Sequence, residues 1–191
     1  MNFTSLPQKI IEKNGIQLTK MTSAKFKLIF DIKNNNIILP SIINFDLIKL
    51  IVKLNPNIFE NIVVDPELEL DLELEINKKI NVLFKDIFSD IGLPQYYISL
   101  NVNKYVDTNK IVFNCFLCDN KLACYPDDVE MLYVDNITIS FEIINNHFIK
   151  INGDIELLEN HGLHPVSQKV IGNIIYNIFI RLKQFIENIA F

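Results

Sequence analysis

The chain has 191 residues, of which 49% are hydrophobic and 21% charged. This composition excludes an intrinsically disordered protein and suits one domain with a sizeable core. The net charge of −5 and the single arginine, Arg181, argue against a nucleic-acid partner, because such binding depends on Lys and Arg contacts with phosphate.

Three cysteines, an odd number, give no disulfide framework. The sequence shows neither an export signal nor the ~20 consecutive apolar residues of a membrane span. We therefore expect an intracellular, cytoplasmic protein without a membrane span, built as a single α+β domain over residues 1–191.

The first predicted elements are a short helix and a strand. The helix runs from Thr4 or Ser5, either of which can cap its first turn, to Gly15, a typical terminator. Over residues 25–33 apolar and polar residues alternate, which is the period of a strand with one buried face. The predicted buried row is Phe26, Leu28, Phe30 and Ile32, and the outer row holds Lys25, Lys27 and Lys33.

Two further helices are predicted from their caps and their apolar spacing. Asn44 is a suitable cap for a helix over residues 45–54. Asn77 is a suitable cap for a helix over residues 77–91, because the apolar residues there recur at the spacing of one helical face. These residues are Ile80, Leu83, Phe84, Ile87, Phe88 and Ile91.

An acidic stretch precedes that helix. In residues 67–76 carboxylates and aliphatic side chains alternate without a break, and only a strand places them on two opposite faces. Carboxylates on one face lie about 6.8 Å apart, too far to converge on a calcium ion, which takes several oxygens. We interpret the row as a solvated face, offset by the lysine row of residues 25–33 if the two strands are neighbours. A surface for an ion or a basic partner is the alternative.

From residue 96 to residue 157 apolar residues recur at every second position, which predicts a series of strands. The last two strands form a hairpin. A three-residue loop at residues 145–147 would place Phe141 opposite Ile151, whereas a two-residue loop would place Phe141 opposite Lys150. Because a slip of one residue inverts a whole face, we predict the longer loop.

The chain closes with a long helix from about Pro165, a residue favoured at a first helical position. Its stripe of apolar residues is wide, and something must cover it: a strongly curved sheet, a partner chain or lipid. The stripe comprises Val170, Ile171, Ile174, Ile175, Ile178, Leu182, Phe185, Ile186 and Ile189, and Tyr176, Phe179 and Ile180 widen it.

The three cysteines resemble part of a zinc site. Cys115 and Cys118 lie three residues apart, and Cys124 follows, but the fourth ligand would have to come from one of the three histidines. Residues three apart on a strand also point to opposite faces. We therefore predict cysteines of the core and no bound metal.

His161 and His164 form an HxxH pair without the glutamate that a zinc protease needs. We interpret the pair as part of a turn before the last helix, and a metal or acid–base site with Glu159 or Asp154 is the alternative. The sequence carries no catalytic or phosphate-binding motif, so we expect no cofactor and favour a protein that is not an enzyme.

Together these elements predict an α+β fold. A single antiparallel sheet of five to seven strands packs against the long C-terminal helix and one or two shorter helices. In architecture this arrangement resembles the hydrophobic-ligand carriers of the helix-grip and tubular lipid-binding types, although no family motif accompanies it. We predict a non-enzymatic binding protein that holds a lipid or another apolar molecule between sheet and helix. The predicted lining is Phe141, Ile151, Ile175, Phe179 and Leu182.

Two alternatives stay open. The first is a protein–protein interaction module, or a subunit of a larger viral or bacterial assembly, that docks a partner chain or forms an oligomer through a helix face or sheet edge. The abundance of Ile and Asn and the scarcity of Ala are typical of an AT-rich genome. The second alternative is a small enzyme built around His161 and His164.

Overall fold

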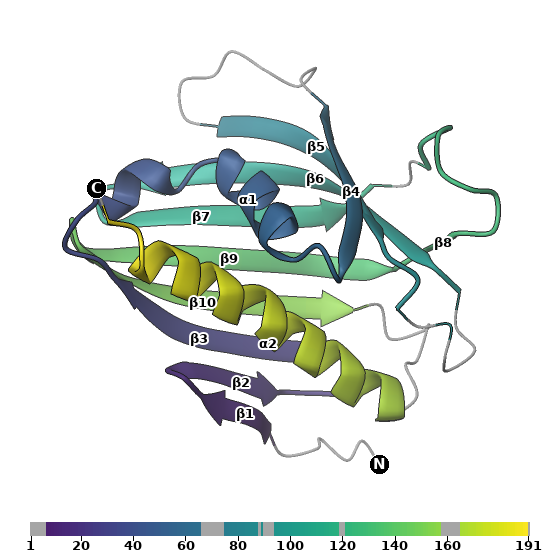
Figure 1. Cartoon of the computed structure of the whole chain (residues 1–191), viewed down its shortest axis with the longest axis horizontal. Coiled ribbons are helices and arrows are strands. Elements are labelled where there is room, and N and C mark those ends of the chain that lie inside the picture. Colours follow the sequence, from purple (N-terminus) through teal and green to yellow (C-terminus); the bar gives the residue numbers. More distant parts are fainter. Residues whose placement is uncertain are drawn as a thin grey trace.

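The computed structural model describes residues 7–65, 75–87, 89, 94–118, 121–157 and 165–190. These residues form one ten-stranded sheet with two α-helices on one face (Figure 1). The predicted α+β class, with an antiparallel sheet against a long C-terminal helix and a shorter helix, is confirmed. The sheet has more strands than the five to seven expected.

The elements follow one another along the chain with α1 in its first third and α2 near its end. The first half holds β1 (Gln8–Lys13), β2 (Ile16–Lys20), β3 (Lys25–Lys33), a 3-10 turn (Leu39–Ile42), α1 (Asp46–Leu54), β4 (Phe59–Asp65) and β5 (Glu75–Phe84). The second half holds β6 (Tyr96–Asp107), β7 (Lys110–Leu117), β8 (Glu130–Met131), β9 (Val134–Asn145), β10 (Phe148–Leu157) and α2 (Pro165–Glu187).

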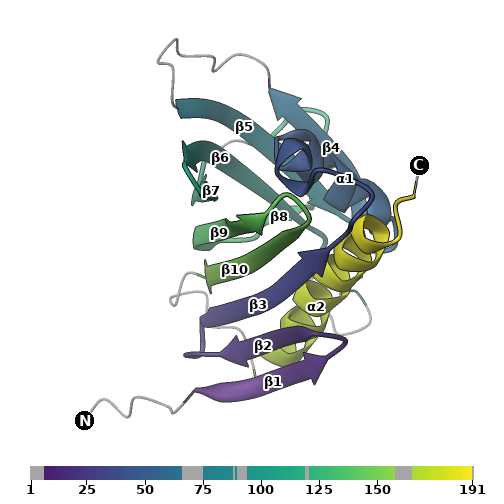
Figure 2. The same ribbon diagram turned by 90° about the vertical axis from the view of Figure 1, so that its left-hand side faces the viewer.

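The sheet has the order β1-β2-β3-β10-β9-β7-β6-β5-β4, and all neighbours on this path are antiparallel. Only the short strand β8, which pairs with β6, runs parallel to its neighbour among the described strands. Figure 2 shows the sheet curving around α1 and α2, both of which lie on its inner side. This curvature covers much of the wide apolar stripe of the last helix.

The predicted strand over residues 25–33 is confirmed as β3, with its four apolar side chains fully buried. The predicted hairpin is confirmed in its register, because Phe141 pairs with Ile151 and Ile137 pairs with Ile155. The loop differs from the prediction. Asn145 pairs with Phe148 across a two-residue turn, and Ile144 forms a bulge that absorbs the extra residue.

The predicted N-terminal helix is wrong over its described part. Residues 8–20 form the β1–β2 hairpin, and the turn residues Asn14 and Gly15 have φ angles of 54° and 72°. Two successive residues with positive φ make the hairpin turn that an Asn-Gly pair strongly favours. Gly15 therefore ends a strand and not a helix, while Thr4 and Ser5 lie outside the described residues.

The predicted helix over residues 77–91 is also wrong, because residues 75–84 form strand β5. Ile80 and Val82 face the inner side of the sheet, whereas Leu83 packs in a small second cluster with Tyr97 and Tyr125. A strand covered on both faces has no clean alternation, and its apolar residues here happened to match helical spacing. Phe88 and Ile91 lie outside the described residues.

The acidic stretch lies mostly outside the described residues, and only its last two positions, 75 and 76, belong to β5. The lysine row on β3 is not next to β5, because β3 pairs with β2 and β10. Its acidic neighbours come from β10 instead. Lys25 forms an ion pair of 3.2 Å with Glu156, and Lys27 stands opposite Asp154.

The helix predicted over residues 45–54 is confirmed as α1 (Asp46–Leu54), and the last helix begins at Pro165 as predicted. The backbone N–H of Asp46 at the start of α1 donates to Asn44 Oδ1 at 2.8 Å. The two helices are joined, since Arg181 Nη1 of α2 donates to the carbonyl of Leu54 at 3.2 Å. Neither described helix combines the length and the hydropathy that a membrane-spanning helix needs.

Candidate ligand-binding cavity

A cavity of about 250 Å³ lies between the sheet and the two helices. The inner faces of β4, β5, β6, β7, β9 and β10 form its floor, and α1 and α2 form its roof. Every surface atom that faces the cavity is apolar. For comparison, an engineered apolar cavity of about 150 Å³ binds benzene, so this space can hold a larger apolar group.

The floor of the cavity follows from the alternation of the strands. Inward positions of β5 and β6 carry Ile80, Val82, Ile98, Leu100 and Val102, and inward positions of β7 and β9 carry Phe113, Cys115, Ile137, Ile139 and Phe141. Because side chains on a strand alternate between faces, one register places all of these apolar residues on the same side.

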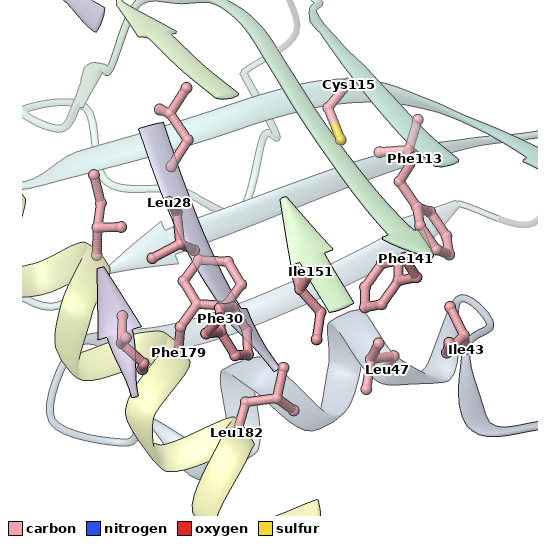
Figure 3. Packing of buried hydrophobic residues seen from close by; sticks show 14 of the residues in the cluster. Leu28, Phe30, Ile43, Leu47, Phe113, Cys115, Phe141, Ile151, Phe179 and Leu182 are labelled. Carbon is pink, nitrogen blue, oxygen red and sulfur yellow. The ribbon is translucent and has the colours of Figure 1, made fainter. Parts of the chain in front are cut away.

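The roof comes from one flank of each helix. On α1 the lining residues are Leu47, Ile48, Ile51 and Val52, and on α2 they are Ile171, Ile174, Ile175, Ile178 and Phe179. The opposite flank of α2 packs on the fully buried core of β2 and β3. Phe179 belongs to both regions, since its ring also lies 5.7 Å from that of Phe30 (Figure 3).

Three of the five residues predicted to line the site, Phe141, Ile175 and Phe179, lie on the cavity wall. Ile151 and Leu182 lie in the solid part of the core, where they are 0% and 1% exposed. Figure 3 shows Ile151 between Phe30 and Phe141, and Leu182 next to Phe179. The wall residues of α1 and of strands β4 to β6 were not predicted as lining.

Those missed residues had a partial signal in the sequence. The alternation of Ile98, Leu100 and Val102 marks them as inward-facing, but nothing local says that β5 and β6 lie opposite α1. Ile80 and Val82 were assigned to a helix, which removed them from the predicted sheet.

Three phenylalanines form one end of the cavity region. The ring of Phe113 lies 5.7 Å from that of Phe45 and 5.9 Å from that of Phe141, both in edge-on geometry. Figure 3 shows Phe113 and Phe141 facing each other near Leu47 of α1. Such edge-to-face contacts fix the rings in place, which gives this end of the cavity a rigid wall.

The cysteines are dispersed. Cys115 is buried on the cavity wall, and burial raises the pKa of its thiol to about 12. Cys124 is exposed, so the prediction of a core residue is wrong for it. Within the described residues no three His, Cys, Asp or Glu side chains come together in a way that could hold a metal ion.

His161, His164 and Glu159 lie outside the described residues, so the predicted turn before α2 and its alternatives are not tested. The third histidine, His147, is part of the β9–β10 turn. Its Nδ1 lies 2.9 Å from the carbonyl oxygen of Ile37, which ties that turn to the segment before α1.

No family model and no curated protein matches the sequence. Solved structures do match over nearly the whole chain. Human StAR-related lipid transfer protein 5 aligns with a TM-score of 0.67 at 8% identity, over 96% of this chain and 87% of that one. The lipid transfer and protein localization domain of human StarD13 aligns with a TM-score of 0.65 at 9% identity, over 96% and 90%.

A StAR-related lipid transfer protein from Xanthomonas axonopodis also aligns, with a TM-score of 0.64 at 5% identity, over 95% of this chain and 99% of that one. The chain has the helix-grip fold of these lipid transfer domains. At such low identity the likeness is one of fold alone, and the residues of the cavity have to be interpreted from their own chemistry.

Proposed function

We propose that this protein binds a lipid or another apolar small molecule in the cavity between its sheet and its helices, and that it acts as a carrier and not as an enzyme. The observation that carries the proposal is the wholly apolar cavity of about 250 Å³. An empty apolar space of this size is costly in a folded protein, and an apolar ligand would restore the lost contacts.

Three features support the proposal. The cavity volume is close to the lower end of the ~300–1,000 Å³ typical of small-molecule sites. Two lining side chains are titratable, and neither is reactive near neutral pH: no polar atom of Tyr96 faces the cavity, burial raises the pKa of its phenol, and the thiol of Cys115 has a pKa of about 12 and is almost entirely protonated. The structures with the same fold are named as lipid transfer proteins.

The proposal is tested by filling the cavity. Ile174 lies on the cavity wall of α2, whereas Asn177 lies on the exposed side of the same helix. We expect Ile174→Phe to weaken binding of the neutral apolar fluorophore N-phenyl-1-naphthylamine about tenfold or more, because the larger ring occupies the ligand space. Asn177→Phe should bind the fluorophore like the unmodified protein.

Fluorescence titration measures both affinities, and circular dichroism checks that each variant is folded. Equal binding by the two variants, or no binding by the unmodified protein, would contradict the proposal. Native mass spectrometry of the purified protein should in addition detect any small molecule that was retained during purification.

The alternative of a protein-interaction module has no specific observation in its favour. In the part of the chain that the structure describes, the large exposed hydrophobic side chains are Ile29, Ile38, Val63, Val106, Phe116, Tyr133, Ile144 and Phe185. They are distributed over β3, β4, β6, β7, β9, α2 and two connecting segments, and exposed apolar side chains are ordinary on a protein surface.

A further inference from the structure

Two lysines stand at one end of the apolar cavity, on the same face of the sheet as its lining residues. In the β5–β6 register Lys78 pairs with Val102, and Lys104 lies two positions beyond Val102 on β6. Lys78 is likewise two positions from Ile80 on β5. Because Ile80 and Val102 both line the cavity, both lysines point to the cavity side of the sheet.

The two ammonium groups lie over aromatic rings that contact each other. Lys78 Nζ is 5.2 Å from the ring centroid of Phe45, and Lys104 Nζ is 6.0 Å from that of Phe113. The two rings are 5.7 Å apart, and Phe113 is itself a lining residue. The side chains therefore converge on the phenylalanine end of the cavity, where Lys104 stands directly opposite Phe113 in the β6–β7 pair.

Neither ammonium group forms an ion pair within the part of the chain that the structure describes. The nearby carboxylate of Asp46, adjacent to Phe45, is engaged by Lys49 at 3.1 Å. Both lysines are half-buried, and desolvation lowers the pKa of Lys104. Beside the apolar cavity there are thus two half-buried cations that meet no carboxylate among the described residues.

We propose that Lys78 and Lys104 bind the anionic head group of the ligand, so that the ligand is a single aliphatic chain ending in a carboxylate or a phosphate. This inference rests on the proposed function. Each ammonium group carries three hydrogen-bond donors, and charge-assisted bonds to carboxylate or phosphate are among the strongest available to a protein.

The size of the cavity sets the expected length of the apolar part. If about 150 Å³ accommodates the six carbons of benzene, about 250 Å³ accommodates roughly ten carbon atoms. A chain of this length, with its tail in the cavity and its head at the two lysines, leaves no polar atom against the apolar wall.

Calorimetric titration with decanoate, decyl phosphate and 1-decanol separates the contribution of the anionic head group to the affinity from that of the aliphatic tail. Lys78→Met with Lys104→Met removes both charges and keeps the apolar stems. Lys79→Met with Lys150→Met is the matched control, because it changes the net charge equally at positions on the outer face. We expect the first variant to lose roughly 10- to 100-fold in affinity for the two anions, and less than twofold for 1-decanol.

The control variant should bind all three compounds like the unmodified protein, and millimolar inorganic phosphate should not displace decanoate, because a free anion lacks the tail. Equal loss for decanoate and 1-decanol in the first variant, or no loss for decanoate, would overturn the assignment of the head group. Displacement of decanoate by inorganic phosphate would show that the site takes a free anion, which would overturn the assignment of an aliphatic ligand. As long as the unmodified protein binds 1-decanol, the proposal that the cavity is the binding site survives any of these outcomes. If it binds none of the three compounds, the proposed function itself fails.

Discussion

Cys115 is the one thiol on the cavity wall, and its environment suppresses its reactivity. It is 7% exposed, it stands opposite Ile137 in the sheet, and burial raises the pKa of the thiol to about 12. Only the thiolate is nucleophilic. Near pH 8 roughly one molecule in ten thousand would carry the thiolate at this position.

This gives a prediction about chemical labelling. In the folded protein near pH 8, iodoacetamide should modify the exposed Cys124 quickly and leave Cys115 unmodified, because both burial and protonation protect the latter. Peptide mass spectrometry after timed alkylation measures the two rates. In concentrated urea both cysteines should react alike, and similar rates in the folded state would contradict the buried placement of Cys115.

At the residue scale the sequence identified side chains that face inward but could not tell which of them line open space. Phe141 and Ile151 are neighbours in the β9–β10 pair and both face inward, yet only Phe141 reaches the cavity. The difference arises from the packing above each side chain: Phe141 lies beneath the open space of the cavity, whereas Ile151 is covered completely by other side chains. The packing density of a core is a property of all its elements together, and alternation along one strand does not report it.

At the scale of elements, the β9–β10 hairpin shows how an apolar pattern determines register and leaves the turn free. The pattern requires Phe141 to pair with Ile151, and a bulge at Ile144 allows this with a two-residue turn. Ile144 is 44% exposed, so the extra residue contributes little to the core. Bulges commonly resolve a mismatch of one residue between two strands.

Deleting one of the two isoleucines at 143–144 should therefore be tolerated. The shortened strand keeps every cross-strand pair of the hairpin, so we expect the free energy of unfolding to fall by less than about 1 kcal/mol. Deleting Thr138, in the middle of β9, should instead cost about 3 kcal/mol or more, because it turns part of the strand over. Urea denaturation measures both losses. Equal losses would show that the bulge is not the site of the extra residue.

At the scale of the whole molecule, the cavity lowers stability unless it is filled. At about 24 cal/mol per Å³ of enclosed void, a volume of about 250 Å³ sets an upper limit of about 6 kcal/mol on the lost contacts, because the cavity is partly open to solvent. A molecule that enters the cavity should therefore stabilise the folded protein, because the unfolded chain offers no such site.

We expect 1-decanol at one hundred times its Kd to stabilise the protein by about 2.7 kcal/mol. For a domain of this size that corresponds to a rise in Tm of about 5–10 °C. Differential scanning calorimetry measures the shift, and Ile174→Phe, whose ring narrows the same space, should reduce it. An unchanged Tm despite calorimetric binding would place the bound molecule outside the cavity.

The sequence by itself determined the elements whose signal is local. Strand β3, the β9–β10 register and helix α2 follow from periodicity over about ten or more consecutive residues, and each was predicted from that periodicity. The Asn14-Gly15 pair is a local hairpin signal as well, and the prediction of a helix ending at Gly15 missed it. Local periodicity works here because burying one face of an element fixes which of its residues turn inward.

Only the tertiary structure decided which elements face each other. Strand β5 is covered on both faces, and the spacing of its apolar residues therefore matches that of a helix. The structure shows that Ile80 and Leu83 belong to two different hydrophobic clusters, one on each face of the sheet. Lys78 and Lys104 lie 26 positions apart in the printed sequence, and their meeting beside Phe113 depends on the β5–β6 pairing. The order of strands and the space left beneath α1 and α2 are set by long-range packing of the whole chain, which no local pattern contains.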